Sequence, residues 1–302
     1  MLIELADKLI RLRTRLSPAM MGGQPRLVRE TYDRYDRLRG YKKYLEFCRS
    51  RLDRPLPQEN TDLHEKGLEI VRIFTPEEAR DVMQKAYSLS TGFTSRRNAG
   101  NRLYFEIKDE RFYLQVLERI FSDEIDARIV RYFGSEYVPF WYVMQESRPG
   151  SRPSNSFLWH CDRGPQRWLK ILLYFTPTRD TGGATVVLDK EESELVAKAG
   201  YTFCKTRDRT SDIRDLENRI GHPLHIMTPE LDAGEGILFE PSQIMHRGLI
   251  PDKAPRVIMQ VQILPSPIHW RKALQRLQQA VMPERDELAF PTHASRLKKI
   301  LA

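Results

Sequence analysis

The 302-residue chain has little cysteine, since Cys48, Cys161 and Cys204 are its only three and none of them forms a CxxC pair. We therefore expect no disulfide framework, and the cytoplasm is the default location. No apolar run approaches the ~20 residues that a bilayer-spanning helix needs. The first residues, MLIELADKLIRLRTRL, carry charges where a secretory signal would have an apolar core. We expect no membrane association.

Several catalytic motifs are also missing. The sequence has no glycine-rich phosphate loop, no GxSxG nucleophile elbow and no HExxH, so hydrolase, kinase and nicotinamide-dependent functions lack their anchor residues. The net charge of +8 comes from Lys and Arg residues spread over the whole chain, and no nucleic-acid-binding motif accompanies it. An anionic small molecule is therefore favoured over nucleic acid as a partner.

The chain divides into blocks with different sequence patterns. Residues 1–62 have helical periodicity and predict a helical extension packed on a core at 63–268, and 269–302 predict a C-terminal helix and tail. At the start of the core, GLEIVRIF (67–74) predicts a strand. TPEEARDVMQKAYSL (75–89) then predicts a helix capped by Thr75, with Glu78 completing a capping box. Further helices are expected at 110–125 and 123–134.

From residue 137 onward the pattern changes to short β-branched and aromatic runs. They are YVPFWYVMQES (137–147), SFLWHCD (156–162), WLKILLYFT (168–176), GATVVLD (183–189), GEGILFEP (234–241) and RVIMQVQILP (256–265). Helices first and strands later, without strict alternation, predict an α+β fold with an antiparallel jelly-roll or cupin-like sandwich wrapped by N-terminal helices. The charged segment 189–230 interrupts the strands and is expected to be a lid-like insertion.

Four side chains in the strand-rich part suggest a metal site. His160 and Asp162 stand two apart, as residues on one face of a strand do. His246 follows a later strand and its turn, and Arg256 opens another apolar strand that contains no carboxylate. Two imidazoles and one carboxylate are the ligand set of non-haem Fe(II) oxygenases. Each residue also has an ordinary alternative: a core histidine, an aspartate capping the RGP turn, a surface-loop histidine and a solvated strand-edge arginine.

In these residues the sequence resembles the Fe(II)/2-oxoglutarate-dependent oxygenases, and among them the phytanoyl-CoA dioxygenase-like group. The resemblance spans roughly residues 66–265 and is carried by GLEIVRIFTPEEARDVM, His160-Cys161-Asp162, LKILLYFTPTRDTGGATVVLDKEES, LDAGEGILFEPSQIMHRG and Arg256. It implies a double-stranded β-helix core and Fe(II) held by His160, Asp162 and His246. It also implies that 2-oxoglutarate lies on Arg256, and that dioxygen hydroxylates an unactivated C–H bond of a small metabolite with release of succinate and CO2. Gly248 departs from the pattern, because many relatives carry a hydroxyl residue there.

Three further residues, Lys170, Tyr142 and Gln145, are candidates for co-substrate binding. Lys170 lies between apolar neighbours and points either into the barrel or outward, while Tyr142 and Gln145 lie an odd number of residues apart, so a regular strand would not aim both inward. In the 189–230 segment, Lys205, Arg207, Arg209 and Arg214 could steer an anionic substrate, or could form a solvated helix face.

Two alternatives to the oxygenase hypothesis remain open at the level of sequence. His222 and His225, with Cys204 nearby, have a spacing found in zinc sites. The protein could instead be a non-catalytic metal-binding or regulatory cupin-like protein that docks a partner through its basic helices. The amphipathic terminal helices also permit a homodimer.

Overall fold

The computed structural model describes residues 40–56, 62–94, 102–150, 155–162, 167–201, 208–279 and 294–302. The helical pattern predicted for residues 1–39 lies outside this described part, and the block boundaries at 62 and 268 remain predictions. The helices are α3 (Tyr41–Arg49), α4 (Asp62–Glu65), α5 (Pro76–Leu89), α6 (Glu110–Ile120), α7 (Asp123–Phe133), α8 (Thr178–Thr181), α9 (Lys190–Lys198), α10 (Ile213–Ile220), α11 (Trp270–Gln279) and α13 (Ala294–Leu301), with a 3-10 turn η2 at Asn155–Phe157. Within the described residues no helix combines the length and apolarity needed to cross a membrane.

The centre of the molecule is an antiparallel sheet of seven strands in the order β1-β7-β5-β9-β4-β3-β2. The strands are β1 (Leu68–Arg72), β2 (Ser90–Thr94), β3 (Arg102–Ile107), β4 (Glu136–Ser147), β5 (Leu169–Tyr174), β7 (Glu235–Phe239) and β9 (Arg256–Ser266). A second, smaller sheet pairs β6 (Thr185–Val187) with β8 (His246–Gly248). Single bridges extend it at both edges, joining His160 to His246 and Val187 to Met227.

Two four-membered layers follow from this pairing. One contains β4, β9, β5 and β7, and the other contains the His160 segment, β8, β6 and the Met227 segment. Along the chain, successive members alternate between the layers except where β6 and the Met227 segment follow each other in the small layer. This strand order is that of a double-stranded β-helix, so the predicted α+β, jelly-roll-like fold is confirmed.

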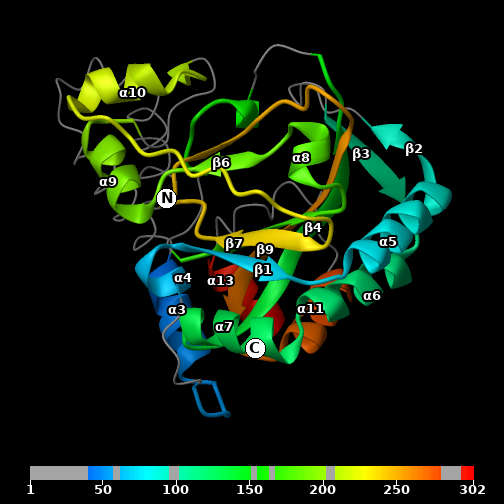
Figure 1. Ribbon diagram of the computed structural model, residues 1–302. Helices are drawn as coiled ribbons and strands as arrows, with labels where there is room; N and C mark the ends of the chain where they lie inside the picture. The colour runs from blue at the N-terminus through cyan, green and yellow to red at the C-terminus, as the bar shows by residue number, and fades with distance from the viewer. Residues whose placement is uncertain are drawn as a thin grey trace.

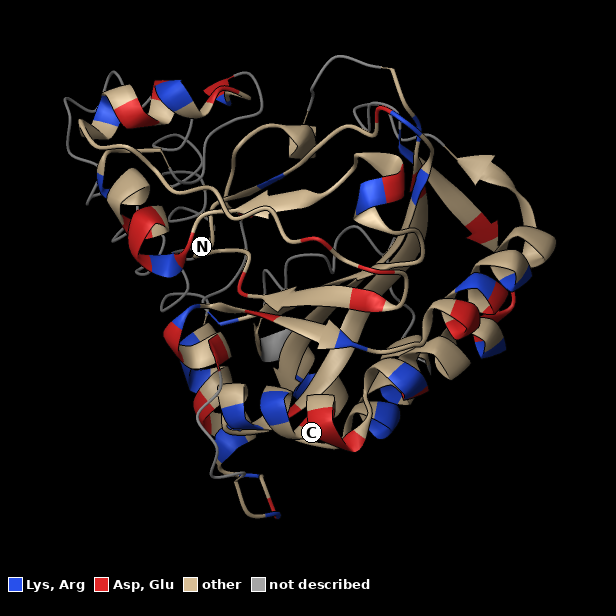
Figure 2. Cartoon of the chain, in the orientation of Figure 1, with Lys and Arg blue, Asp and Glu red and all other residues tan. Residues whose placement is uncertain are grey.

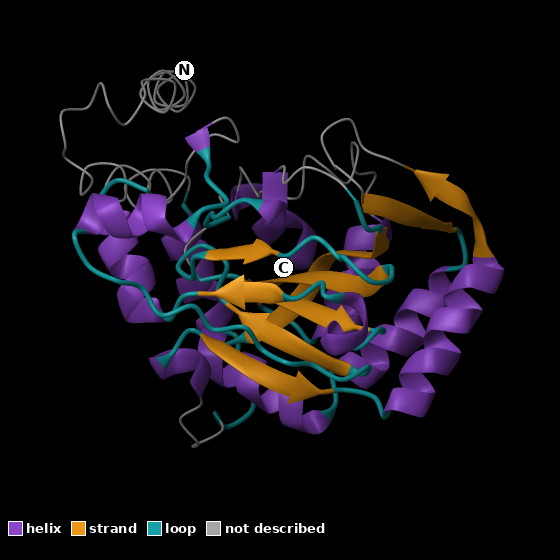
Figure 3. Cartoon of the chain, turned by 45° about the horizontal axis from the view of Figure 1, so that its top comes forward, coloured by secondary structure: helices purple, strands orange, loops and turns teal. Residues whose placement is uncertain are grey.

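Helices cover the outer face of the large sheet. Helices α7 and α11 pack on β4, and α3 packs on β9 (Figure 1). Strand β5 is buried at every position, because helices and the small sheet lie on its two faces. In the turned view the strands form a central layer with helices around it (Figure 3). Helices such as α7 and α10 carry both blue and red residues (Figure 2), whereas α11 and α13 contain basic residues and no acidic ones, so the basic charge is mixed with acidic charge on only some of the described helices.

Local sequence explains how the core begins. Thr75 accepts a hydrogen bond from the Glu78 amide, and the Glu78 carboxylate accepts one from the Thr75 amide at 2.9 Å, which confirms the predicted capping box of α5. Before β7, Gly234 has φ +91°, and a Cβ there would lie 2.2 Å from the Phe74 carbonyl oxygen. Only glycine fits this turn, where the carbonyl of Gly234 accepts from the amides of Ile73 and Phe74.

One predicted strand is wrong and three strands, β2, β3 and β8, were not foreseen. The segment 156–162 forms a 3-10 turn and then a single bridge, because its amides bond to three different segments: Trp159 to Thr210, His160 to His246 and Asp162 to Pro241. A ladder needs one continuous partner, so no strand forms. Strands β2 and β3, in contrast, extend the large sheet beyond β4.

Candidate metal centre

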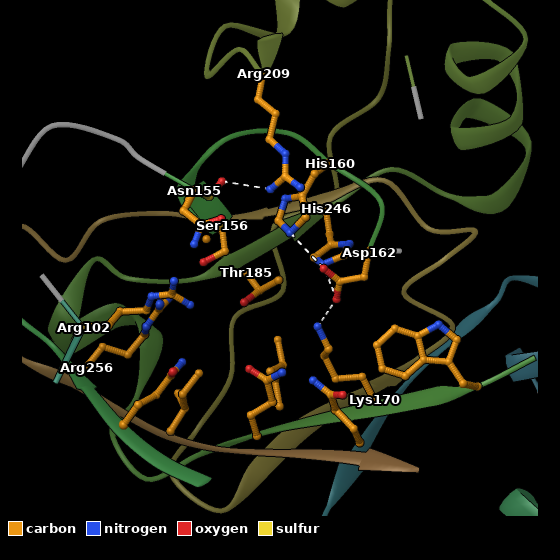
Figure 4. Close-up of a pocket in the computed structure, with 17 residues that line it drawn as sticks. Arg102, Asn155, Ser156, His160, Asp162, Lys170, Thr185, Arg209, His246 and Arg256 are labelled. Atoms are coloured by element: carbon orange, nitrogen blue, oxygen red, sulfur yellow. Dashed lines mark hydrogen bonds and ion pairs between the residues drawn. The ribbon is translucent and has the colours of Figure 1, made fainter. Parts of the chain in front are cut away.

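A cavity of about 210 Å³ opens beside the small sheet, above strands of the large sheet (Figure 4). The side chains around it come from both layers and from the loops between them. They are Arg102, Gln145, Asn155, Ser156, His160, Asp162, Trp168, Lys170, Leu172, Thr185, Arg209, His246, Gly248, Arg256, Ile258, Gln260 and Gln262. Of the residues expected to form the site, His160, Asp162, His246, Arg256, Lys170 and Gln145 therefore meet at one cavity.

His160, Asp162 and His246 converge at one end of this cavity. Each offers one ligand atom, and these atoms all lie within 4.8 Å of one another. The Nε2 atom of His160 is 3.3 Å from Oδ1 of Asp162, and the Nε2 atom of His246 is 3.8 Å from Oδ2. The two histidines are brought together by their backbone bridge, in which each amide donates to the other residue's carbonyl at 3.0 Å.

Both imidazoles have a defined tautomer. The Nδ1 atom of His160 lies 2.7 Å from the Leu158 carbonyl oxygen, and that of His246 lies 2.8 Å from the Ile244 carbonyl oxygen. A carbonyl only accepts, so Nδ1 carries the proton and Nε2 presents its lone pair to the cavity. Burial lowers the pKa of both rings, that of His246 well below the usual range with the His160 ring adding to the effect. Two neutral imidazoles result, as a divalent metal site would need.

Asp162 supplies the carboxylate of the cluster. Burial by itself raises a carboxyl pKa, but the Lys170 ammonium and the two histidines outweigh it and hold the pKa of Asp162 well below its usual range. Lys170 enters the cavity from β5 and binds Oδ2 of Asp162, which leaves Oδ1 beside the His160 ring. Of the two orientations considered for Lys170 the inward one is observed, and its described partner is the candidate metal ligand.

Arg256 lies at another end of the cavity, at the start of β9, and is only 3% exposed. Its Nη1 atom donates to backbone carbonyls of Ala184 at 3.2 Å and Leu249 at 3.4 Å, while Nε has no partner among the described residues. Burial, and then the neighbouring Arg102 guanidinium, lower the pKa of Arg256 against the opposing effect of Tyr174. A buried guanidinium held by neutral oxygens is a site for an anion.

The register of β4 and β9 decides which predicted residues reach the cavity. Gln145 pairs with Ile258, which lines the cavity, whereas Tyr142 pairs with Val261, which belongs to the core. Tyr142 therefore faces the helices, with its ring 5.2 Å from that of Tyr113. Tyr142 has the opposite parity to Gln145 and is not among the residues that line this cavity, so its contact with the co-substrate stays a prediction that this geometry does not favour.

Sequence reasoning missed several residues of the cavity. Gln260 and Gln262 lie on the same face of β9 as Arg256. Their i, i+2 spacing from a candidate site residue could have predicted this. Thr185, which also lines the cavity, was missed, as was its hydrogen-bond partner Tyr174, which is not a lining residue. Tyr174 donates to the Thr185 hydroxyl at 2.7 Å, and no local pattern indicated that these residues, eleven apart, would meet.

Gly248 has a steric explanation. A Cβ at this position would lie 3.2 Å from the Phe157 ring and 3.4 Å from Nη2 of Arg256, so a larger residue would crowd the guanidinium. Thr185 pairs directly with Gly248 across the small sheet and lines the cavity. A hydroxyl is therefore present one strand away from the position where the resemblance led us to expect it.

The basic residues of the 189–230 segment and the zinc alternative have different outcomes. Arg209 lines the cavity, whereas Arg214 is exposed and pairs with Asp212 at 2.8 Å. Lys205, Arg207 and Cys204 lie outside the described residues, so the zinc alternative with His222 and His225 stays a prediction. Within the described part, His160, Asp162 and His246 form the cluster whose geometry suits a metal ion.

The strand order and this ligand set together have the form expected of Fe(II)/2-oxoglutarate-dependent oxygenases: a double-stranded β-helix with two histidines and one aspartate at the small sheet. The fold and the three-residue cluster that the resemblance implied are therefore both present. The donor set also fits Fe(II), because it combines two neutral nitrogens with one carboxylate oxygen and these atoms lie within 4.8 Å of one another.

Comparisons with known proteins find related folds at low identity. No family model matches the chain, and no curated protein matches it. Among solved structures, the chain is similar to the non-haem alpha-ketoglutarate-dependent epimerase SnoN from nogalamycin biosynthesis, with 14% identity and a TM-score of 0.46 over 74% of this chain and 84% of that one. It is also similar to EctD from S. alaskensis with bound Fe, with 14% identity and a TM-score of 0.48 over 72% and 85%. CytC3 with Fe(II) and alpha-ketoglutarate matches with 15% identity and a TM-score of 0.41 over 68% and 75%.

Proposed function

We propose that this protein is an Fe(II)- and 2-oxoglutarate-dependent oxygenase that hydroxylates an unactivated C–H bond of a small molecule. The observation that carries the proposal is one cavity with two different ends: a His–Asp–His cluster at one, and a buried Arg256 with neutral backbone partners at the other. The first suits a divalent metal and the second suits a carboxylate.

In the proposed site, His160, Asp162 and His246 hold the ferrous ion through Nε2, a carboxylate oxygen and Nε2. The Nδ1 hydrogen bonds to Leu158 and Ile244 keep both rings in the ligating orientation. Lys170 restrains Oδ2 of Asp162 and so favours a single carboxylate oxygen as ligand. The bound metal would supply the oxygen chemistry, with release of succinate and CO2.

The co-substrate would be oriented by the opposite end. Arg256 offers its guanidinium to the distal carboxylate of 2-oxoglutarate, and the hydroxyl pair of Tyr174 and Thr185 lies beside it. Phe157 covers this end, with the guanidinium carbon of Arg256 5.8 Å from the ring centroid. An apolar cover excludes water and strengthens the ion pair that forms there.

The first experiment asks whether the cavity binds both groups. Anaerobic addition of Fe(II) and 2-oxoglutarate to the purified protein should produce a weak visible charge-transfer band, which requires metal and chelating co-substrate at one place. Asp162→Ala should abolish the band, whereas Asp212→Ala, outside the cavity, should retain it. A wild-type protein without a band contradicts the proposal.

The second experiment separates an oxygenase from a protein that only binds. In air, the loaded wild-type protein should release succinate from 2-oxoglutarate, slowly without substrate and faster with it. Binding of metal and 2-oxoglutarate without any succinate would instead favour the regulatory alternative.

A further inference from the structure

We propose that the substrate is a small polar anion, and that Arg209 binds its carboxylate or phosphate group beside the metal. This inference rests on the proposed function of the cavity and names the class of molecule that the remaining space accepts.

The charge of the cavity is the first argument. Four of its side chains are cationic, namely Arg102, Lys170, Arg209 and Arg256, and Asp162 is the one carboxylate among the lining residues that the structure describes, which leaves a net charge of +3 when both histidines are neutral. The two positive charges of Fe(II) and the two negative charges of 2-oxoglutarate cancel, so loading the site leaves this excess unchanged. An anionic substrate reduces it.

The positions of the arginines are the second argument. Arg102 and Arg256 share one end, with their guanidinium carbons 5.9 Å and 5.8 Å from the centroid of the same Phe157 ring. Arg209 enters from the other side and ends next to His160 (Figure 4), and its charge contributes to lowering the pKa of that ring. Its Nη1 atom donates to the Asn155 carbonyl at 3.3 Å. Arg209 is thus close to the metal ligands but separate from the end assigned to the distal carboxylate.

The polarity of the walls is the third argument. Buried Oε1 atoms of Gln145 and Gln262, and the buried Nε1 of Trp168, have no hydrogen-bond partner in the described structure, and all three side chains line the cavity. A polar substrate can satisfy such groups, whereas an alkyl chain would leave each of them buried without a hydrogen bond, which is unfavourable.

The size of the space is the fourth argument. A cavity of about 210 Å³ is smaller than the ~300–1,000 Å³ of common small-molecule sites, and 2-oxoglutarate takes part of it. The part of the substrate that lies inside the cavity is therefore compact, with an anionic group and hydrogen-bonding groups close to each other.

The test uses pairs of probes that differ in charge. Protein loaded with Ni(II) and saturating N-oxalylglycine, a non-reacting 2-oxoglutarate analogue, is titrated with 3-hydroxypropanoate or with 3-hydroxypropanamide. Glycerol 1-phosphate and glycerol form the phosphate arm. Binding is followed by tryptophan fluorescence, because Trp168 lines the cavity. We expect the anion of at least one pair to bind ~10-fold or more tightly than its neutral partner, which corresponds to at least ~1.4 kcal/mol, and the preferred pair distinguishes carboxylate from phosphate.

Variants assign the preference to Arg209. Arg209→Gln should remove the difference between anion and neutral probe, Arg209→Lys should retain part of it, and Arg214→Gln should leave it unchanged. In all three, the affinity for N-oxalylglycine should equal that of wild type. Equal binding of both members of each pair overturns the inference, and so does an Arg209→Gln variant that keeps the preference for the anion, whether or not it loses N-oxalylglycine affinity.

A failure of the proposed function gives a different experimental result from a failure of this inference. If wild type binds neither Ni(II) nor N-oxalylglycine, the oxygenase assignment is wrong. The same probe pairs titrated against metal-free wild type and Arg209→Gln would then still show whether Arg209 prefers an anion.

Discussion

Replacing Arg256 by Met separates a ligand-binding arginine from a structural one. Met keeps much of the apolar volume of the side chain and removes the charge. The structure gives the guanidinium three bonds to backbone carbonyls, of 3.5, 3.2 and 3.4 Å, and no carboxylate partner among the described residues. In the ligand-free protein the Arg256 charge is therefore buried without a carboxylate partner among the described residues.

Arg256→Met should weaken 2-oxoglutarate binding strongly and change the stability of the ligand-free protein only slightly. Loss of a paired, buried contact to the distal carboxylate should cost about 3 kcal/mol of 2-oxoglutarate binding, which raises its Kd or KM roughly 100-fold. The stability of the ligand-free protein should change by no more than about 1 kcal/mol, because three long hydrogen bonds are lost while an unpaired buried charge is removed.

Two measurements check these expectations. Urea denaturation of the metal-free protein gives the free energy of unfolding, and succinate release at varied 2-oxoglutarate gives KM. Arg72→Met is the matched control, since Arg72 lies on β1 and pairs with Glu235 at 2.6 Å at an exposed site, and it should leave KM unchanged. A loss of about 3–5 kcal/mol of stability in Arg256→Met, the range for breaking a buried ion pair, with unchanged KM would refute the reasoning.

Three further predictions concern the metal site and the fold. Lys170→Met frees Oδ2 of Asp162 and should weaken Fe(II) binding by about 10–100-fold, as loss of an outer partner of a metal ligand commonly does; competition with a chelator measures this, and unchanged affinity would show that Lys170 does not position the ligand. Thr75→Ala removes the cap of α5 and should lower the free energy of unfolding by about 1 kcal/mol, measured by urea denaturation with succinate release as the control that should not change. Gly234→Ala places a Cβ 2.2 Å from the Phe74 carbonyl oxygen at φ +91° and should destabilise the protein by at least about 1–3 kcal/mol; a thermal midpoint equal to that of wild type would contradict the assigned turn geometry.

The sequence by itself determined the elements whose signals are local. Strand periodicity located β4, β5, β7 and β9, and the capping box marked the start of α5. Each of these patterns depends on neighbours within a few residues, so no tertiary information was needed. The spacing of His160 and Asp162, with His246 and Arg256 later in the chain, also indicated the ligand set, because the chemistry of Fe(II) sites restricts which residue types occur together.

Only the tertiary structure decided which side chains share the cavity. The bridge between His160 and His246 joins segments 86 residues apart, and the register of β4 against β9 turned Gln145 inward and Tyr142 outward. The pairing of Lys170 with Asp162, and the approach of Arg209 to the candidate metal ligands, likewise depend on how distant segments pack. A strand alternates faces at every residue, so a shift of one position in a long-range register reverses what the cavity contains, and no local sequence pattern fixes that register.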